Sequence, residues 1–181
     1  KGYGLGDKFG EKLSGLAGVK YATGTTSKLK SDVNMLQEKL NNAKRSEQSY
    51  SDEFGRQVSM NPTHAAKLFQ TFNGEVEKWD SKGNPLKYKE ITYAQYGEED
   101  VKNYVHSIMP SVDWNTLSDT DKDLYFDIAA SDGIIVDRKT FSSISALYNA
   151  RNQADIEGRN LQKQINDYND DMNSFKDRNK H

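Results

Sequence analysis

The residues best suited to acid–base chemistry are aspartates and histidines in the middle of this chain. Paired carboxylates held in a cleft can exchange protons with a substrate. An enzyme site here would draw on the following residues: Asp119, Asp121, Asp127, His64 and His106. These aspartates, with Asp123 among them, come directly after Ser118, where carboxylates stabilise the N-terminus of a helix. The chain has no nucleophile elbow, phosphate-binding loop or dinucleotide fingerprint. We therefore predict a protein that is not an enzyme.

A second candidate for chemistry is the stretch 130–135, whose Asp132-Gly133 pair resembles the centre of an EF-hand calcium loop. Calcium binding requires oxygen ligands at loop positions 1, 3, 5 and 12. With Gly133 at position 6, these places fall on Ile128, Ala130, Asp132 and Lys139. Only the aspartate can ligate, so we expect a turn between two helices. The three histidines (His64, His106 and His181) lack metal-ligand spacing and the chain has no cysteine, so we expect neither metal nor cofactor.

Tyrosines and lysines alternate between residues 87 and 104. The set comprises Tyr88, Tyr93, Tyr96, Tyr104, Lys87, Lys89 and Lys102. Aromatic rings beside lysines can stack and clamp single-stranded nucleic acid. Acidic residues at 90 and 98–100 offset that charge, and the net charge of the whole chain is only −2. We expect core and surface positions here, with a protein-contact patch as the alternative, and no specific nucleic acid.

These residues must be positioned by helices, because the strongest periodic signal is a heptad rhythm near both ends of the chain. In the last stretch, steps of 4, 3, 4 and 3 separate Leu161, Ile165, Tyr168, Met172 and Phe175. Extending that rhythm backward reaches Gly158, Ala154 and Arg151, so the arginine must snorkel or pair. A matching run begins at Leu29, Val33, Leu36 and Leu40, and continues through Ala43 to Tyr50 and Phe54.

This pattern predicts a mainly α protein in which two long helices, residues 26–58 and 141–179, form an antiparallel coiled-coil hairpin. The helices could instead pair with a second copy of the chain. Between them, residues 59–140 should form a small, mostly helical insert with one short strand or hairpin near 86–93. Within it we expect a helix from Pro62 to about Trp79 and another from Glu98 to Met109. Serines and Gly55 should weaken the last third of the first long helix.

Residues 1–25 form a glycine-rich leader. Gly2, Gly6 and Gly10 stand four apart, so in a helix they would form a smooth strip for close packing or membrane contact. A flexible leader is the alternative, since each interior glycine costs a helix about 1 kcal/mol.

The composition fits extended helices. Only 34 % of residues are hydrophobic and 29 % are charged, and a two-helix seam requires about two apolar residues in seven. Ten tyrosines, seven phenylalanines and two tryptophans argue against disorder throughout.

Three features resemble helical virion proteins of tailed bacteriophages, of the internal, ejected or tail-associated kind. They are the stretch Gly2 to Gly18, the polar heptad helices, and the presence of only three prolines: Pro62, Pro85 and Pro110. Bacterial coiled-coil surface proteins and the helical hairpins of secretion systems share these features. The resemblance implies a virion location and packing among many copies or against a portal or tail assembly.

Three functions therefore remain open. The first is a non-enzymatic structural or interaction protein that binds proteins or itself through its helices. The second is a membrane-perturbing delivered protein that inserts residues 1–25. The third is an enzyme with a site in the insert.

Overall fold

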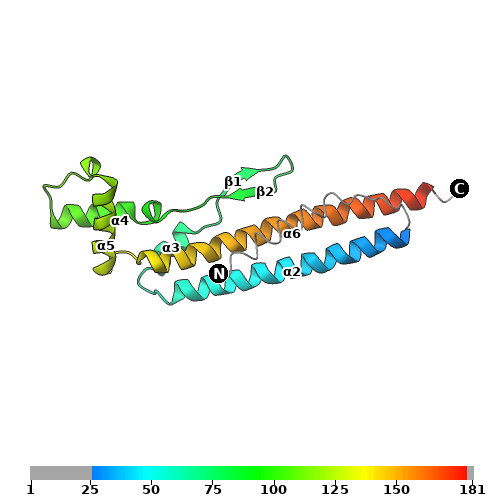
Figure 1. Cartoon of the computed structure of the whole chain (residues 1–181), viewed down its shortest axis with the longest axis horizontal. Coiled ribbons are helices and arrows are strands. Elements are labelled where there is room, and N and C mark those ends of the chain that lie inside the picture. The colour runs from blue at the N-terminus through cyan, green and yellow to red at the C-terminus, as the bar shows by residue number, and fades with distance from the viewer. Residues whose placement is uncertain (1–25, 179–181) are drawn as a thin grey trace. The chain divides into compact units, whose positions relative to one another are not determined.

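A computed structural model describes residues 26–178 of the chain (Figure 1). This part is mainly helical, as the sequence predicts, with one two-stranded antiparallel sheet. Its elements are α2 (Thr26–Ser59), α3 (Ala65–Thr71), β1 (Val76–Trp79), β2 (Pro85–Tyr88), α4 (Tyr93–Ile108), the 3-10 helix η1 (Trp114–Thr116), α5 (Asp119–Ser131) and α6 (Arg138–Arg178). Within residues 26–178, no helix combines the length and apolar character that crossing a membrane requires.

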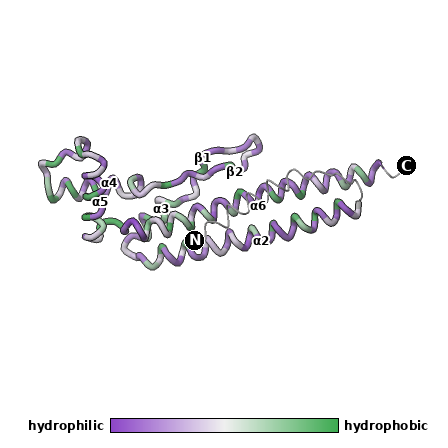
Figure 2. Tube along the Cα trace, in the orientation of Figure 1, coloured by the Kyte–Doolittle hydropathy of each residue, from purple (hydrophilic) through white to green (hydrophobic). Residues whose placement is uncertain are grey.

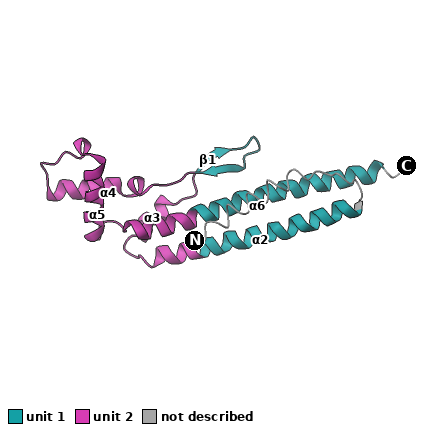
Figure 3. Cartoon of the chain, viewed as in Figure 1, with its two compact units in different colours: residues 1–52, 76–88, 149–181 teal, residues 53–75, 89–148 magenta. Residues whose placement is uncertain are grey.

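The chain divides into two compact units (Figure 3). Unit 1 comprises residues 1–52, 76–88 and 149–181, and unit 2 comprises residues 53–75 and 89–148. The division differs from the expected insert boundaries at 59 and 140. Residues 76–88, which form the β1–β2 hairpin, belong to unit 1 together with most of α2 and α6. The last residues of α2 (53–59) and the first residues of α6 (138–148) belong to unit 2.

In unit 1, apolar residues recur along both long helices (Figure 2) and bury themselves in one cluster. Its fully buried members are Leu29, Leu36, Leu40, Ala43, Leu161, Ile165 and Tyr168. The remaining element is the β1–β2 hairpin, whose turn is organised by Asp80. The carboxylate of Asp80 accepts hydrogen bonds from the backbone N–H groups of Lys82 and Asn84, at 2.9 and 2.8 Å. Gly83 takes a φ of 82° there, a conformation that glycine adopts at no steric cost.

Unit 2 is built on an aromatic core. Its buried rings come from the end of α3, from α4, η1 and α5, and from the start of α6: Phe72, Tyr96, Trp114, Phe126, Phe141 and Tyr148. Gly97 allows α4 to pack closely against Phe126 and Ile135. A Cβ at this position would lie 2.9 Å from Phe126 Cε1 and 3.2 Å from Ile135 Cδ1.

Side-chain caps fix where the helices of unit 2 begin. Thr92 and Gln95 form a reciprocal capping box at the start of α4. Ser118 accepts from the N–H of Asp121 at 3.2 Å and caps α5, as its position in the sequence suggests. The Asp137 carboxylate accepts from the N–H of Thr140 at 2.7 Å, so α6 begins at Arg138 rather than at residue 141.

Several expected elements are wrong. The helix expected from Pro62 to Trp79 ends at Thr71, and Val76 lies in β1 instead of on a helix face. The expected short strand or hairpin near 86–93 is present as the β1–β2 hairpin, but its strand ends at Tyr88. Tyr93 begins α4, which therefore starts five residues before Glu98. The weak C-terminal third expected of the first long helix is also wrong, since α2 is helical through Gly55 to Ser59.

Candidate functional site

The candidate site is the surface along which α2 and α6 meet in unit 1. The predicted seam residues that it buries are Leu29, Leu36, Leu40, Leu161, Ile165 and Tyr168. Val33 and Met172 pack against this cluster while remaining partly exposed, and Phe175 is half-buried near the end of α6. Full burial of a leucine side chain contributes about 2 kcal/mol relative to exposure, so this seam is the main apolar contact of unit 1.

Beyond Ala43 on α2, the seam turns polar. We call the side chains Glu47, Arg151, Asn152, Asp155 and Glu157 the polar layer. Arg151 Nη2 lies 3.6 Å from Glu47 Oε1, so the arginine expected to need a partner has one on α2. Arg151 Nη1 also donates to Asn152 Oδ1 at 3.1 Å. This arginine therefore joins both helices through charge-assisted contacts.

Two members of the polar layer are deeply buried. Asn152 is 3 % exposed and Glu157 is 1 % exposed. Gln153 Nε2 donates to Glu157 Oε1 at 3.3 Å, whereas none of the residues that the structure describes accepts a hydrogen bond from Asn152 Nδ2. Buried polar groups cost stability unless paired. The buried Asn152 amide therefore makes this part of the seam less stable than an apolar residue would.

Asp155 ties the β1–β2 hairpin to α6. Its carboxylate accepts a hydrogen bond of 2.5 Å from the Tyr88 hydroxyl and pairs with Arg159 Nε at 3.1 Å. Arg159 Nη1 in turn donates to Asn84 Oδ1 in the hairpin turn at 3.4 Å. Both ends of β2 are thus held by one turn of α6.

Burial and charge perturb the acids and phenols of this region. Burial, and next the charge of Asp155, raise the pKa of Glu47 above its ordinary value despite nearby Arg151. Burial, followed by the hydrogen bond to Asp155, raises the pKa of Tyr88 to about 12. Burial and the charge of Glu157 raise the pKa of Tyr50. The site is therefore a partly desolvated interface in which acids and arginines lie close together.

Comparison with known proteins gives no relative. No family model, curated protein or solved structure matches this chain. Function must therefore be argued from the geometry.

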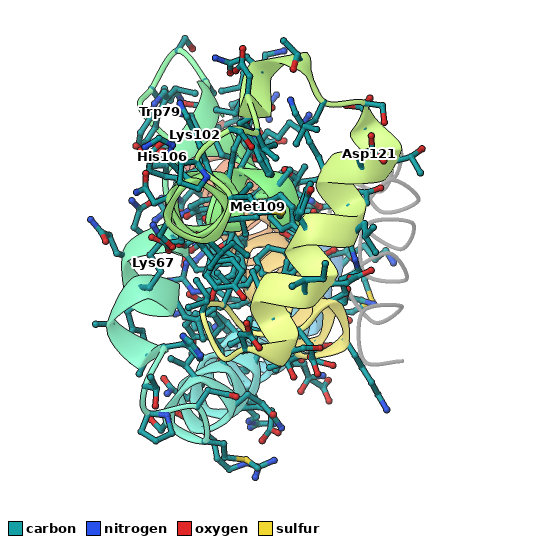
Figure 4. The ribbon with its side chains drawn as sticks, turned by 90° about the vertical axis from the view of Figure 1, so that its left-hand side faces the viewer. Lys67, Trp79, Lys102, His106, Met109 and Asp121 are labelled. Atoms are coloured by element: carbon teal, nitrogen blue, oxygen red, sulfur yellow. The ribbon has the colours of Figure 1, made fainter. Side chains whose placement is uncertain are left out.

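The residues considered for enzyme chemistry have separate surroundings. His106 on α4 and Asp121 on α5 are exposed and lie apart (Figure 4). Asp127 pairs with Arg138 Nε at 2.9 Å. His64 is the N-cap residue of α3. Among the described residues, no group of His, Cys, Asp or Glu side chains is arranged to hold a metal ion.

The Asp132-Gly133 loop is a turn between α5 and α6, with a φ of 76° at Gly133. Its aspartate accepts a hydrogen bond from the Tyr104 hydroxyl. The other tyrosines of the alternating stretch are similarly engaged, since Tyr93 donates to the Val136 carbonyl at 2.5 Å and the Tyr96 hydroxyl accepts from the Val136 N–H at 3.2 Å.

Two lysines of that stretch pair with glutamates. Lys87 pairs with Glu77 at 2.9 Å and Lys89 pairs with Glu75 at 3.2 Å. Lys102 is half-buried on α4. Residues 87 and 88 belong to unit 1, whereas residues 89–104 belong to unit 2. Gly2, Gly6 and Gly10, together with His181, lie outside the described residues.

Sequence reasoning overlooked most of the polar layer, although one signal was present. The α2 rhythm passes from Ala43 by a step of 4 to Glu47 and by a step of 3 to Tyr50. Glu47 is therefore a seam position, as Arg151 is on α6. Opposite charges at seam positions of two long helices indicate a pair. Asn152 and Glu157 carried no such signal.

Proposed function

We propose that this chain is a non-enzymatic structural or interaction protein whose stem is an antiparallel coiled-coil hairpin of α2 and α6. The observation that carries the proposal is the buried cluster to which both helices contribute. Long paired helices supply reach and stiffness, and the sequence devotes 34 and 41 residues to them.

The antiparallel direction is supported by contacts along the pair. The Asp32 charge raises the pKa of Tyr168 after burial does, and Leu40 Cδ1 lies 3.7 Å from where a Cβ on Gly158 would be. Glu47 faces Arg151. Numbers rise along α2 while they fall along α6, as in a hairpin within one chain.

The polar layer supports a stem with a fixed register. A polar residue at a coiled-coil core position specifies register and partner while reducing stability. Here a charged pair and a buried amide interrupt an otherwise apolar seam. A fixed register would hold the elements attached to the two helices at defined positions along the stem.

Within this class, we propose a virion component of a tailed bacteriophage, of the internal, ejected or tail-associated kind. The support comes from three sequence features: polar helices with an apolar seam, few prolines, and a glycine-rich stretch from Gly2 to Gly18. Its partners would be other virion proteins or further copies of the chain. The membrane-perturbing alternative depends on residues 1–25, and liposome binding by the full chain would favour it.

Cysteine cross-linking tests the hairpin directly, because the natural chain has no cysteine. Leu40→Cys with Gly158→Cys should form a disulfide within one chain upon oxidation, giving a faster-moving monomer on a non-reducing gel. Met35→Cys with Gly158→Cys is the matched control, because Met35 is 42 % exposed. A cross-linked dimer from the first pair would show that the helices pair between chains. No cross-link would reject the helix pairing.

A further inference from the structure

The β1–β2 hairpin of unit 1 turns one strand toward α6 and leaves the other at the surface. β2 contacts α6 through the hydrogen bond of Tyr88 with Asp155. β1 lies on the side of β2 that faces away from α6 (Figure 1). Three of its four residues, Glu77, Lys78 and Trp79, are exposed. β1 is therefore the outer edge of a two-stranded sheet, and an edge strand offers its backbone N–H and C=O groups to another strand.

The side chains of β1 are typical of a contact surface. Trp79 is 56 % exposed, and tryptophan is enriched at the centres of protein interfaces. Lys78 stands directly opposite Lys87 of β2, and like charges in this position destabilise a sheet. Glu77 pairs with Lys87 at 2.9 Å. A further carboxylate brought beside Lys78 by a partner would offset the repulsion between the two lysines.

The order of residues in β1 makes this strand complementary to itself. In an antiparallel pair centred between Glu77 and Lys78, each glutamate lies opposite a lysine of the other chain. Val76 and Trp79 then lie opposite each other at both ends of the pair. Opposite charges and aromatic residues beside β-branched ones are both favourable cross-strand pairs. The partner that matches β1 is therefore β1 of a second copy.

Other arrangements of two β1 strands are disfavoured. Register irregularities on either side of Lys78, and the lysine itself, discourage indiscriminate pairing of an edge strand. An antiparallel pair centred on Glu77 or on Lys78 sets that residue against its own copy, and so does a parallel pair in register. Like charges directly opposite each other are destabilising. Beyond the strand, the favoured arrangement sets Glu75 against Asp80, so the pairing is confined to the four residues of β1.

We propose that β1 pairs with β1 of a second copy of this chain, which joins two hairpins into one four-stranded antiparallel sheet. The inference rests on the proposed function, in which further copies of the chain are partners, and it names the contact that joins two of them. The contact is isologous, because each copy contributes the same strand, so it closes at two copies. Four paired residues make a small interface, so the dimer should be weak and concentration-dependent.

The test measures solution mass by light scattering at protein concentrations from about 10 μM to 1 mM, a range that covers the dissociation constants of weak contacts. Wild type should gain mass with concentration and approach the mass of two copies. Glu77→Lys and Lys78→Glu should each associate roughly tenfold more weakly or remain monomeric, because both charged cross-strand pairs become like-charge pairs. The controls are Glu90→Lys and Lys82→Glu, which make the same charge changes at exposed positions outside β1 and should associate as wild type does.

Restoring the opposite charges separates strand pairing from damage to the hairpin, which matters because Glu77 also pairs with Lys87 within one chain. An equimolar mixture of the two single variants should dimerise, since the lysines of one chain then face the glutamates of the other. The double variant Glu77→Lys with Lys78→Glu should dimerise by itself for the same reason.

A monomeric wild type, single variants that associate as wild type does, or a mixture that stays monomeric would each overturn the proposal. Binding of a monomeric wild type to vesicles of phosphatidylcholine and phosphatidylglycerol would overturn it as well and assign Trp79 to a lipid surface. The cross-link between positions 40 and 158 tests the stem independently, so failure of β1 pairing and failure of the proposed function give different results.

Discussion

Placing a charge in the seam should destabilise unit 1 far more than placing the same charge beside it. Leu161 is fully buried in the cluster between α2 and α6. Truncating such a leucine costs about 3 kcal/mol, and burying a polar group without a partner adds roughly 2 kcal/mol. Leu161→Asp should therefore cost about 5 kcal/mol, which is comparable to the whole stability of a small domain.

Urea denaturation followed by far-UV circular dichroism measures this cost. The matched control is Lys163→Asp, an exposed position on the same helix. Lys163 lowers the pKa of Asp80 through its charge, a minor influence, so its replacement should barely move the midpoint. Leu161→Asp should lower the midpoint strongly or abolish the transition of the stem. Equal shifts for the two variants would refute the seam.

Four further predictions concern Gly97, Gly158, Tyr88 and the ion pair of Glu47 with Arg151. Gly97→Ala should destabilise unit 2 by roughly 1–3 kcal/mol through overlap with Phe126. Gly158→Ala, with ordinary contact to Leu40, should instead stabilise α6 by about 0.5–1 kcal/mol; thermal melts compare the two, and a destabilising Gly158→Ala would contradict the geometry. Tyr88 should ionise near pH 12. Because folding raises the pKa of Tyr88, the contribution of Tyr88 to stability is complete below pH 10 and is lost as the pH rises through 12. In an ultraviolet titration, Tyr88→Phe should remove one phenol that ionises near pH 12. Glu47→Arg and Arg151→Glu should each destabilise the stem, and the double variant should recover about 1 kcal/mol as coupling; additive losses would show that the pair contributes nothing.

The sequence predicted the long helices well because their signal is repetitive. A seam of seven-residue period can be read from Leu29 to Leu40 and again from Leu161 onward without knowing which residues touch. The same applies to Ser118, whose side chain caps the helix directly after it. Local patterns of this kind need no tertiary contact to be interpreted.

The start of the hairpin was mispredicted because two local signals competed. Val76 fits the helical spacing from Phe72, and this spacing suggested a helix to Trp79. The helix ends before Val76, because Phe72 has a ψ of 78° and so leaves helical geometry. Gly74, with a φ of 72°, then continues the turn toward β1. At the other end of the hairpin, the Thr92 and Gln95 capping box begins α4, although the preceding residues favour a strand.

The polar layer could be predicted only in part. Arg151 and Glu47 occupy seam positions and so carry a periodic signal. The Tyr88 to Asp155 hydrogen bond joins residues 67 apart in the chain, and the burial of Asn152 depends on packing around α6. Contacts of this range follow from the assembled unit rather than from any local pattern.

A purely apolar seam would leave the register of the proposed hairpin poorly defined, since a slip of one heptad brings apolar residues together again. The polar layer removes that degeneracy. In the proposed register, Glu47 faces Arg151. A slip of seven residues along α2 would set Arg151 against Leu40 or Phe54, both apolar. It would also leave Glu47 without its cation in a setting that already raises its pKa through burial. Each alternative register sets a partly exposed charge against apolar side chains and leaves it without its partner. The ion pair therefore favours the proposed register over the neighbouring ones.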